Sequence, residues 1–487
     1  MFFHNVHNVH NVRFVHTVHK VHRRRDMRMH YRLSFVLTVS ILVMACFDAL
    51  AAEIVWTKTT GQYPVECTPV MGSFDGRPAI IAVNRGGEVM AWGLDGTDLG
   101  KEADGRVAQL PKGIWSSSPA VIPAEQGGGI VVCDTKGKVV ALDGAFQPRW
   151  EYQLPGETSF SCAAPAVLQL PGRTDSAFVL SDQSGTVTCL DASGKSAWQT
   201  QLGTGEGDAL VSVFSDEKDK ALLASAGMQL HRLDSTGRIV WSHDLKTKVS
   251  SRAEVLDMGA GPMVFCGTES GKLSALKMDG TSAWTTFIGD EVGNTIVLLP
   301  RPKEQPLLLC TGLWGNLYAF DGGGRRVWTY VFRSKNRGRP AVADFNGDGR
   351  QEVLVTGYNQ HVFMVNDTGE LLDDVRLSGC LNGSALLLEG AGGVVPEVLT
   401  VDASLLAHRL QMGRPRCVYG ATPPAERVKI TLPVRSLEGE EATVKVENPC
   451  GALLRVNLAN RPAGVAARIG GCISARSAFE VPCQKKK

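Results

Sequence analysis

The sequence lacks the patterns that most membrane spans and catalytic sites require. After residue 52 no apolar run reaches eighteen residues, the length needed to cross a bilayer, so a polytopic membrane protein is excluded. The GxSxG elbow of hydrolases and the phosphate loop of nucleotide-binding enzymes are absent. Only four of the 11 histidines lie beyond residue 52, and none has the HExxH or another metal-ligand spacing. These four are His231, His243, His361 and His408. His231 and His361 fall in predicted strands, where a structural role is expected.

The 12 cysteines also lack diagnostic spacing. No CxxC, CxxCH or adjacent pair occurs, which argues against a zinc knuckle or an attached haem. Cys46 lies in the leader, and the remaining eleven cannot all pair internally. Three lie in apolar runs and are expected to pack as small apolar side chains in strands; these are Cys133, Cys266 and Cys310. Disulfides among Cys450, Cys472 and Cys483 stay open, because connectivity cannot be read from sequence.

Residues 1–52 form a leader. An apolar stretch at 33–51 follows several arginines and ends in Ala49-Leu50-Ala51, the pattern of a secretory signal peptide at about residues 27–52. We therefore expect an exported protein that is periplasmic, cell-surface or secreted, with a mature start near Ala52 or Glu53. Lipid attachment at Cys46 is an alternative, because Val43-Met44-Ala45-Cys46 resembles a lipobox.

Histidine recurs every third residue in parts of the tract that precedes the signal peptide, residues 1–22. A His-rich tract can bind metal. Alternatively, Met27 or Met29 starts the protein, since either gives a signal peptide of normal length, and the tract is an upstream extension.

The positive charge of the chain belongs to its leader. The leader holds seven of the 51 basic and two of the 49 acidic residues, which leaves 44 and 47 in residues 53–487, a net charge near −3. Nucleic-acid binding requires clustered positive charge, so no nucleic-acid partner is expected.

Internal repeats dominate the rest of the chain. One template has a glycine, an alternating strand, an aspartate, a glycine-containing turn and a strand carrying tryptophan. Its five clear copies are GKVVALDGAFQPRW (137–150), GTVTCLDASGKSAW (185–198), GMQLHRLDSTGRIVW (227–241), GKLSALKMDGTSAW (271–284) and GNLYAFDGGGRRVW (315–328). Divergent copies lie at 87–99, 359–372 and 402–413.

The spacing of the repeat predicts a β-propeller. The marker position recurs every 43 to 51 residues, the length of one four-stranded blade. Trp56 lies 43 residues before the marker Leu99, whereas the copy at 402–413 lacks a marker strand. We therefore predict that residues 53–60 complete the last blade and close a ring of eight, which removes exposed strand edges. The fold class is all-β, with the propeller at residues 53–420.

The two most regular residues of the template, the tryptophan and the aspartate, are expected to have structural roles. A tryptophan at blade spacing is expected to pack between blades, because large aromatic side chains dominate core burial. The template aspartate is expected to cap its own turn by accepting backbone hydrogen bonds. The aspartates concerned are Asp143, Asp191, Asp234, Asp279, Asp321 and Asp367.

These copies resemble the PQQ-like repeat over about residues 53–420. That repeat builds eight-bladed quinoprotein dehydrogenases and also a non-catalytic outer-membrane assembly lipoprotein of the same shape. The resemblance implies the propeller fold, but the repeated residues are expected to pack the blades and say little about a reaction or a ligand. Quinoproteins that oxidise alcohols with a calcium-held PQQ often place a vicinal disulfide over the quinone, and that Cys-Cys pair is missing here.

A candidate calcium loop lies at residues 344–352, DFNGDGRQE. Oxygen ligands at positions 1, 3, 5 and 9, with a glycine after the third of them for the sharp turn, suit the oxygen shell of Ca²⁺. The loop resembles the FG-GAP repeat of integrin-type propellers. That resemblance implies side-chain ligation by Asp344, Asn346, Asp348 and Glu352 and ligation by the Arg350 carbonyl. The alternative is an Asx-rich turn without metal. A shortened remnant, residues 73–77, has too few ligands.

After a linker at 421–424, residues 421–487 contain about four short alternating strands and predict a small β-rich module.

The functional interpretation is an exported, non-catalytic propeller that binds or scaffolds a protein or glycan partner, since blades present variable loops on a rigid ring. A periplasmic quinoprotein-like oxidoreductase with PQQ in the channel is the alternative. A propeller hydrolase or lyase is a third option, for which no nucleophile or base is identified.

Overall fold

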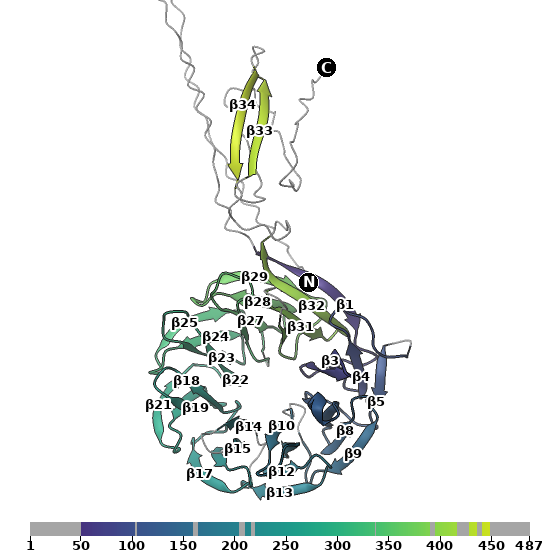
Figure 1. Cartoon of the computed structure of the whole chain (residues 1–487). Coiled ribbons are helices and arrows are strands. Elements are labelled where there is room, and N and C mark those ends of the chain that lie inside the picture. The colour runs from purple at the N-terminus through teal and green to yellow at the C-terminus, as the bar shows by residue number, and fades with distance from the viewer. Residues whose placement is uncertain are drawn as a thin grey trace, which may run out of the picture. The chain divides into compact units, whose positions relative to one another are not determined.

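The computed structural model describes residues 50–102, 105–158, 164–203, 210–215, 220–336, 338–389, 395–415, 428–435 and 441–448. The described residues form eight four-stranded antiparallel sheets and one separate hairpin. Their only helical element is a single 3-10 turn, η1 (Ala124–Gln126). The eight sheets are arranged as blades around a common centre (Figure 1). The prediction of an all-β, eight-bladed propeller is therefore confirmed.

Each blade is a meander in which consecutive strands pair, and its first strand lies nearest the centre of the ring (Figure 1). Blade 1 comprises β2 (Val70–Phe74), β3 (Arg77–Val83), β4 (Glu88–Trp92) and β5 (Arg106–Gln109). Blade 2 comprises β6 (Ala120–Val121), β7 (Ile130–Cys133), β8 (Lys138–Leu142) and β9 (Pro148–Gln153). Blade 3 comprises β10 (Ala166–Gln169), β11 (Ser176–Ser181), β12 (Thr186–Leu190) and β13 (Ser196–Gln201). Blade 4 comprises β14 (Leu210–Ser215), β15 (Lys220–Ala226), β16 (Gln229–Leu233) and β17 (Ile239–Asp244).

The next three blades repeat the same order. Blade 5 comprises β18 (Glu254–Asp257), β19 (Pro262–Gly267), β20 (Lys272–Leu276) and β21 (Ser282–Phe287). Blade 6 comprises β22 (Val292–Leu299), β23 (Leu307–Gly312), β24 (Asn316–Phe320) and β25 (Arg326–Val331). Blade 7 comprises β26 (Ala341–Ala343), β27 (Glu352–Thr356), β28 (His361–Val365) and β29 (Leu371–Arg376).

Blade 8 joins the two ends of the propeller. It comprises β30 (Leu386–Leu388), β31 (Glu397–Asp402) and β32 (Leu406–Pro415), with β1 (Leu50–Thr59) as its outer strand. β1 pairs antiparallel with β32, and Trp56 lies opposite Arg409 (Figure 1). The predicted closure of the ring is confirmed, and the closing strand begins at Leu50, inside the predicted cleavage region.

The hydrophobic core lies between neighbouring blades. The two middle strands of a blade are buried on both faces, so they are nearly continuous apolar runs, as in β7 and β23. One cluster joins Ile81 and Val89 of blade 1 to Val132 and Val140 of blade 2. Burial of such side chains from both neighbours provides the main stabilisation, about 25 cal/mol per Å² of apolar surface.

The marker tryptophans connect consecutive blades. Trp284 packs against Phe265, with ring centroids 5.9 Å apart, and its Nε1 donates a hydrogen bond of 2.9 Å to the Gly322 carbonyl in the next blade. The turn glycine Gly324 has a φ of +80°, and a Cβ there would lie 2.6 Å from the Trp284 ring. The same bond to the next blade is made by Trp56, Trp150, Trp198, Trp241 and Trp328. The predicted packing role is confirmed.

The prediction for the turn aspartates is confirmed in part. Asp143, for example, accepts hydrogen bonds from the backbone N–H groups of Ala145 and Gln147. The prediction for Asp367 is wrong, because the capping position of the repeat template falls on Asn366, one residue earlier. Asn366 caps that turn, and Asp367 is buried and pairs with Arg350 at 2.6 Å.

The C-terminal hairpin consists of β33 (Val428–Arg435) and β34 (Glu441–Asn448), which pair antiparallel. The other strands predicted for residues 421–487 lie outside the described residues, as do the leader with Cys46 and the three C-terminal cysteines. In the part of the chain that the structure describes, no helix is long and apolar enough to cross a membrane.

Candidate binding site at the channel mouth

One face of the ring is built from two kinds of connection. The hairpins between the second and third strands of each blade lie beside the linkers that join each outer strand to the next blade. Backbone hydrogen bonds join the two, as from Thr135 N to Ile114 O (3.0 Å) and from Tyr358 N to Lys335 O (3.0 Å). We call this surface the hairpin face. The remaining hairpins lie at the other ends of the strands and form the opposite face.

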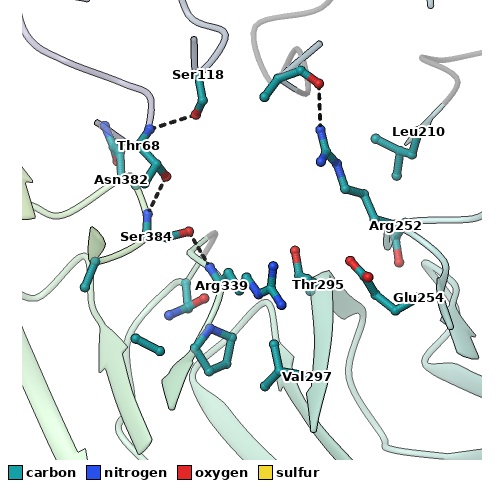
Figure 2. Close-up of a pocket in the computed structure, with 18 of the residues that line it drawn as sticks. Thr68, Ser118, Leu210, Arg252, Glu254, Thr295, Val297, Arg339, Asn382 and Ser384 are labelled. Atoms are coloured by element: carbon teal, nitrogen blue, oxygen red, sulfur yellow. Dashed lines mark hydrogen bonds between the residues drawn. The ribbon is translucent and has the colours of Figure 1, made fainter. Parts of the chain in front are cut away.

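The linkers and innermost strands line a central cavity with a volume of about 1140 Å³. Four glutamates and three basic side chains lie in its wall. They are Glu66, Glu254, Glu269, Glu291, Lys248, Arg252 and Arg339. Hydroxyl and amide side chains share the remaining wall with aliphatic side chains such as Leu210 and Val297, so the cavity is about equally polar and apolar (Figure 2).

A chain of hydrogen bonds runs along the cavity wall from blade to blade. The Arg339 N–H donates to Ser384 Oγ (2.7 Å), the Ser384 N–H to Thr68 Oγ1 (3.1 Å), and the Thr68 N–H to Ser118 Oγ (2.9 Å) (Figure 2). The four residues occupy the same repeat position, directly before the innermost strand. Satisfied backbone groups at these positions fix the wall in one conformation.

Two arginines occupy this repeat position in blades 5 and 7. Arg252 Nη2 donates a hydrogen bond of 3.1 Å to the Ala164 carbonyl across the cavity. The Arg339 side chain is exposed and extends toward Thr295 and Glu254 (Figure 2). Burial raises the pKa of the Glu254 carboxyl, although the positive charges of Arg339 and Arg252 oppose the shift. This part of the wall can therefore offer both charged donors and a carboxyl group.

Unpaired polar atoms and aromatic rings lie beside these charges. Ser116 Oγ, Asn336 Oδ1 and Asn382 Oδ1 are buried in the cavity wall, and no described residue forms a hydrogen bond with them. Trp314 is 66% exposed, and Tyr358 is 40% exposed and lines the cavity. Buried polar atoms without partners favour a ligand that supplies complementary groups.

Three of the four histidines that the structure places are held within their own blades. His231 is buried and lies 2.7 Å from Ser242 Oγ through Nδ1, and burial lowers its pKa. His361 Nδ1 lies 2.8 Å from Asp374. His408 is buried in blade 8, with Nε2 3.1 Å from Asp402 and Nδ1 3.1 Å from Thr57 Oγ1. All three lie away from the channel cavity.

The predicted calcium loop is one turn between β26 and β27. Asp344 accepts hydrogen bonds from the backbone N–H groups of Gly347, Asp348 and Gly349. Asn346 Nδ2 lies 3.1 Å from Asp348 Oδ2 and 3.3 Å from Glu352 Oε1. The side-chain oxygens of the loop thus lie close together, but in this structure they accept hydrogen bonds from backbone and amide N–H groups.

No set of three acidic, histidine or cysteine side chains in the described residues is arranged to hold a metal. The Arg350 side chain pairs with Asp367. Burial, together with the charges of Asp348 and Asp344, raises the pKa of Glu352 to about 7. Calcium binding at this loop therefore stays a prediction.

Sequence reasoning missed the residues of the channel wall. Their signal is a polar residue before Pro-Ala-Val or a related run at the start of each blade, as in Ser118-Pro119 and Arg339-Pro340.

Comparisons with known proteins support this fold. Residues 183–373 match the family described as outer membrane protein assembly factor BamB. The crystal structure of BamB from Moraxella catarrhalis has a TM-score of 0.54 at 18% identity, covering 74% of this chain and 97% of that one. Sqt1 from Saccharomyces cerevisiae has a TM-score of 0.54 at 15% identity, covering 74% and 98%. The computationally designed Ika8 protein has a TM-score of 0.52 at 12% identity, covering 73% and 99%. No curated protein sequence matches the chain.

Residues 183–373 are PQQ-like propeller repeats. The resemblance inferred from the tryptophan template is confirmed for this part of the chain. For the remaining blades, structural similarity at these identities shows the propeller fold alone. A PQQ-like propeller serves catalytic and non-catalytic proteins, so function has to be argued from the site.

Proposed function

We propose that this protein is an exported, non-catalytic propeller that binds a partner protein on its hairpin face. The exposure of Trp314, two-thirds of whose surface is open to solvent next to Lys335, carries the proposal. Trp, Tyr and Arg are the residue types that dominate the binding energy of protein interfaces. The backbone bonds between hairpins and linkers hold them in place before a partner binds, which lowers the entropic cost of association.

Affinity capture with matched variants tests the proposal. The parent protein, Trp314→Ala and Met228→Ala are each cross-linked in cells and purified from the envelope. Met228 is the control, because it is 52% exposed on the corresponding hairpin of blade 4. We expect a protein that is captured by the parent and by Met228→Ala, but at least ten-fold less by Trp314→Ala. Equal capture by all three, or capture of glycan alone, contradicts the proposal.

The alternative is a quinoprotein-like oxidoreductase, and the cavity fits it poorly. PQQ carries three carboxylates, whereas the charged side chains of the cavity wall include four glutamates and three basic groups. Among the described residues that line the cavity, Tyr358 is the only aromatic one, so this part of the wall offers no broad aromatic surface for a tricyclic ring. Titration with PQQ and Ca²⁺, followed by absorbance and alcohol oxidation, tests this alternative. Stoichiometric binding with turnover supports it.

We also propose that the loop at 344–352 binds a structural Ca²⁺, because its side-chain oxygens converge within one turn. The ion would fix the hairpin between β26 and β27. Calorimetry with the parent and with Asp344→Ala tests this, using Asp75→Ala in the corresponding hairpin of blade 1 as control. Uptake of one Ca²⁺ that Asp344→Ala abolishes and Asp75→Ala retains is expected. No uptake by the parent contradicts the proposal.

Export and anchoring are tested by fractionation. The signal peptide predicts a processed protein outside the cytoplasm. Release of Cys46→Ser from a membrane fraction that retains the parent would support the lipid anchor.

A further inference from the structure

The linker between blades 6 and 7 is a basic segment whose described cations form no ion pair with a described carboxylate. Residues 332–340, FRSKNRGRP, contain no acidic residue. Of its described basic side chains, Arg333, Lys335 and Arg339, none forms an ion pair with a described carboxylate. The comparable linker at 245–253 differs, because Lys246 pairs with Asp244 at 2.6 Å and Lys248 with Glu269 at 2.8 Å. The positive charges of Arg333 and Lys335 are therefore available to a partner, whereas the charge of Arg339 also acts on Glu254 in the cavity wall.

Aromatic rings flank this charge. Lys335 Nζ lies 5.3 Å from the centroid of the exposed Trp314 ring, and the Lys335 carbonyl accepts a hydrogen bond from Tyr358 N–H. Asp290 lies near the same hairpin, but it accepts a hydrogen bond from Trp314 N–H at 3.2 Å rather than pairing with the linker. Basic and aromatic groups thus form one surface that extends to Arg339 and Tyr358 in the cavity wall.

The linker is held in place by bonds to both neighbouring hairpins and to blade 8. Its anchoring bonds are Phe332 N to Gly315 O (2.9 Å), Asn336 N to Leu313 O (3.1 Å), Asn359 N to Ser334 Oγ (2.8 Å) and Arg339 N to Ser384 Oγ (2.7 Å). A preorganised surface of this kind loses little conformational entropy on binding.

We propose that Arg333, Lys335 and Arg339, together with Trp314 and Tyr358, form the docking site for an extended acidic segment of a partner protein. Carboxylates of the segment pair with Arg333 and Arg339, whose planar guanidinium groups suit bidentate recognition. An apolar side chain of the segment packs on Trp314. At the cavity edge, the unpartnered Oδ1 of Asn336, a residue only 1% exposed, accepts an N–H of the segment. The proposal rests on the protein-binding function and identifies the chemistry of its partner.

A peptide probe tests the proposal with the full chain. The probe is a fluorescent 12-residue peptide with four Asp or Glu residues alternating with Trp and Leu; its counterpart has Lys in place of each acid. We expect the acidic peptide to bind at least ten-fold more tightly than the Lys peptide, with an affinity that falls as salt increases. Arg333→Glu/Arg339→Glu and Trp314→Ala should each weaken binding at least ten-fold. Met228→Ala and Arg325→Glu, a basic residue on the opposite face, should not.

Equal binding of the two peptides, or binding unchanged by Arg333→Glu/Arg339→Glu, overturns the proposal. Equally tight binding of inorganic polyphosphate also overturns it, because the site would then recognise anions in general. A melting temperature like that of the parent shows that the charge-reversal variant is folded. If the parent and this variant capture the same protein equally in cells, the acidic-segment proposal fails and the protein-binding function stands. If the parent captures none, the function itself fails.

Discussion

Single residues connect the sequence repeat to the stability of the ring. Each marker tryptophan contacts the turn of the next blade through its ring and its Nε1. Replacing Trp284 by Ala removes this ring and leaves a cavity, so we expect a loss of about 3–5 kcal/mol in the free energy of unfolding. Denaturant unfolding measures the loss. Trp314→Ala is the control, because an exposed side chain should change stability by only about 0.5 kcal/mol. Equal effects of the two substitutions would contradict the packing role.

Buried thiols are a second residue-scale feature. Burial raises the pKa of Cys67, Cys189, Cys266 and Cys310 to about 12, so these thiols stay protonated and inaccessible at neutral pH. Iodoacetamide labelling with peptide mapping should leave them unmodified in the native protein and modify them after unfolding. Cys380, which is partly exposed, provides the comparison. Rapid labelling of the buried four under native conditions would contradict the described core.

At the scale of elements, blade 8 is held together by a buried aspartate. Asp402 accepts hydrogen bonds from Ser378 Oγ and Gly379 N–H, and it contacts His408, which contacts Thr57 of β1. Burial opposes ionisation of Asp402, but these hydrogen bonds and the His408 contact lower its pKa overall. A lowered pKa in the folded state adds stability above the usual aspartate pKa of about 4, and this stability is lost as the pH falls further.

The contribution of Asp402 can be measured by its pH dependence. Asp402→Asn should be less stable than the parent at neutral pH, and the difference should shrink as the pH falls below about 4. Thermal melts at several pH values measure this, with Asp75→Asn in an exposed hairpin as control. A difference that stays constant with pH would contradict the role of the charge.

The strands were predictable from the sequence because the repeated residues are those that pack between blades, so their spacing marks the position of each strand. Trp56 predicted the closing strand, since its spacing matched the other markers. The turn at Asn366 was assigned wrongly, because Asn and Asp both cap turns and adjacent residues satisfied the template. The polar residues of the channel wall were not predicted, since Ser118, Arg339 and Ser384 come from different blades and meet only when the ring closes.

At the scale of the whole molecule, closure places the described linkers and their hairpins on one face. The basic 332–340 linker lies there beside Trp314, and its significance depends on neighbours from other parts of the chain. The charge composition alone indicates a nearly neutral chain without a charged surface, because acidic and basic residues are almost equal in number over residues 53–487. The local excess of unpaired positive charge on the described residues of this linker becomes apparent only when the ion pairs of the folded chain are known.

Photo-cross-linking in cells tests the central claim most directly. A photoreactive amino acid is placed at position 314 on the hairpin face or at position 325 on the opposite face. We expect a protein cross-link from position 314 and none from position 325. A cross-link only from position 325, or none from either position, would contradict binding on the hairpin face.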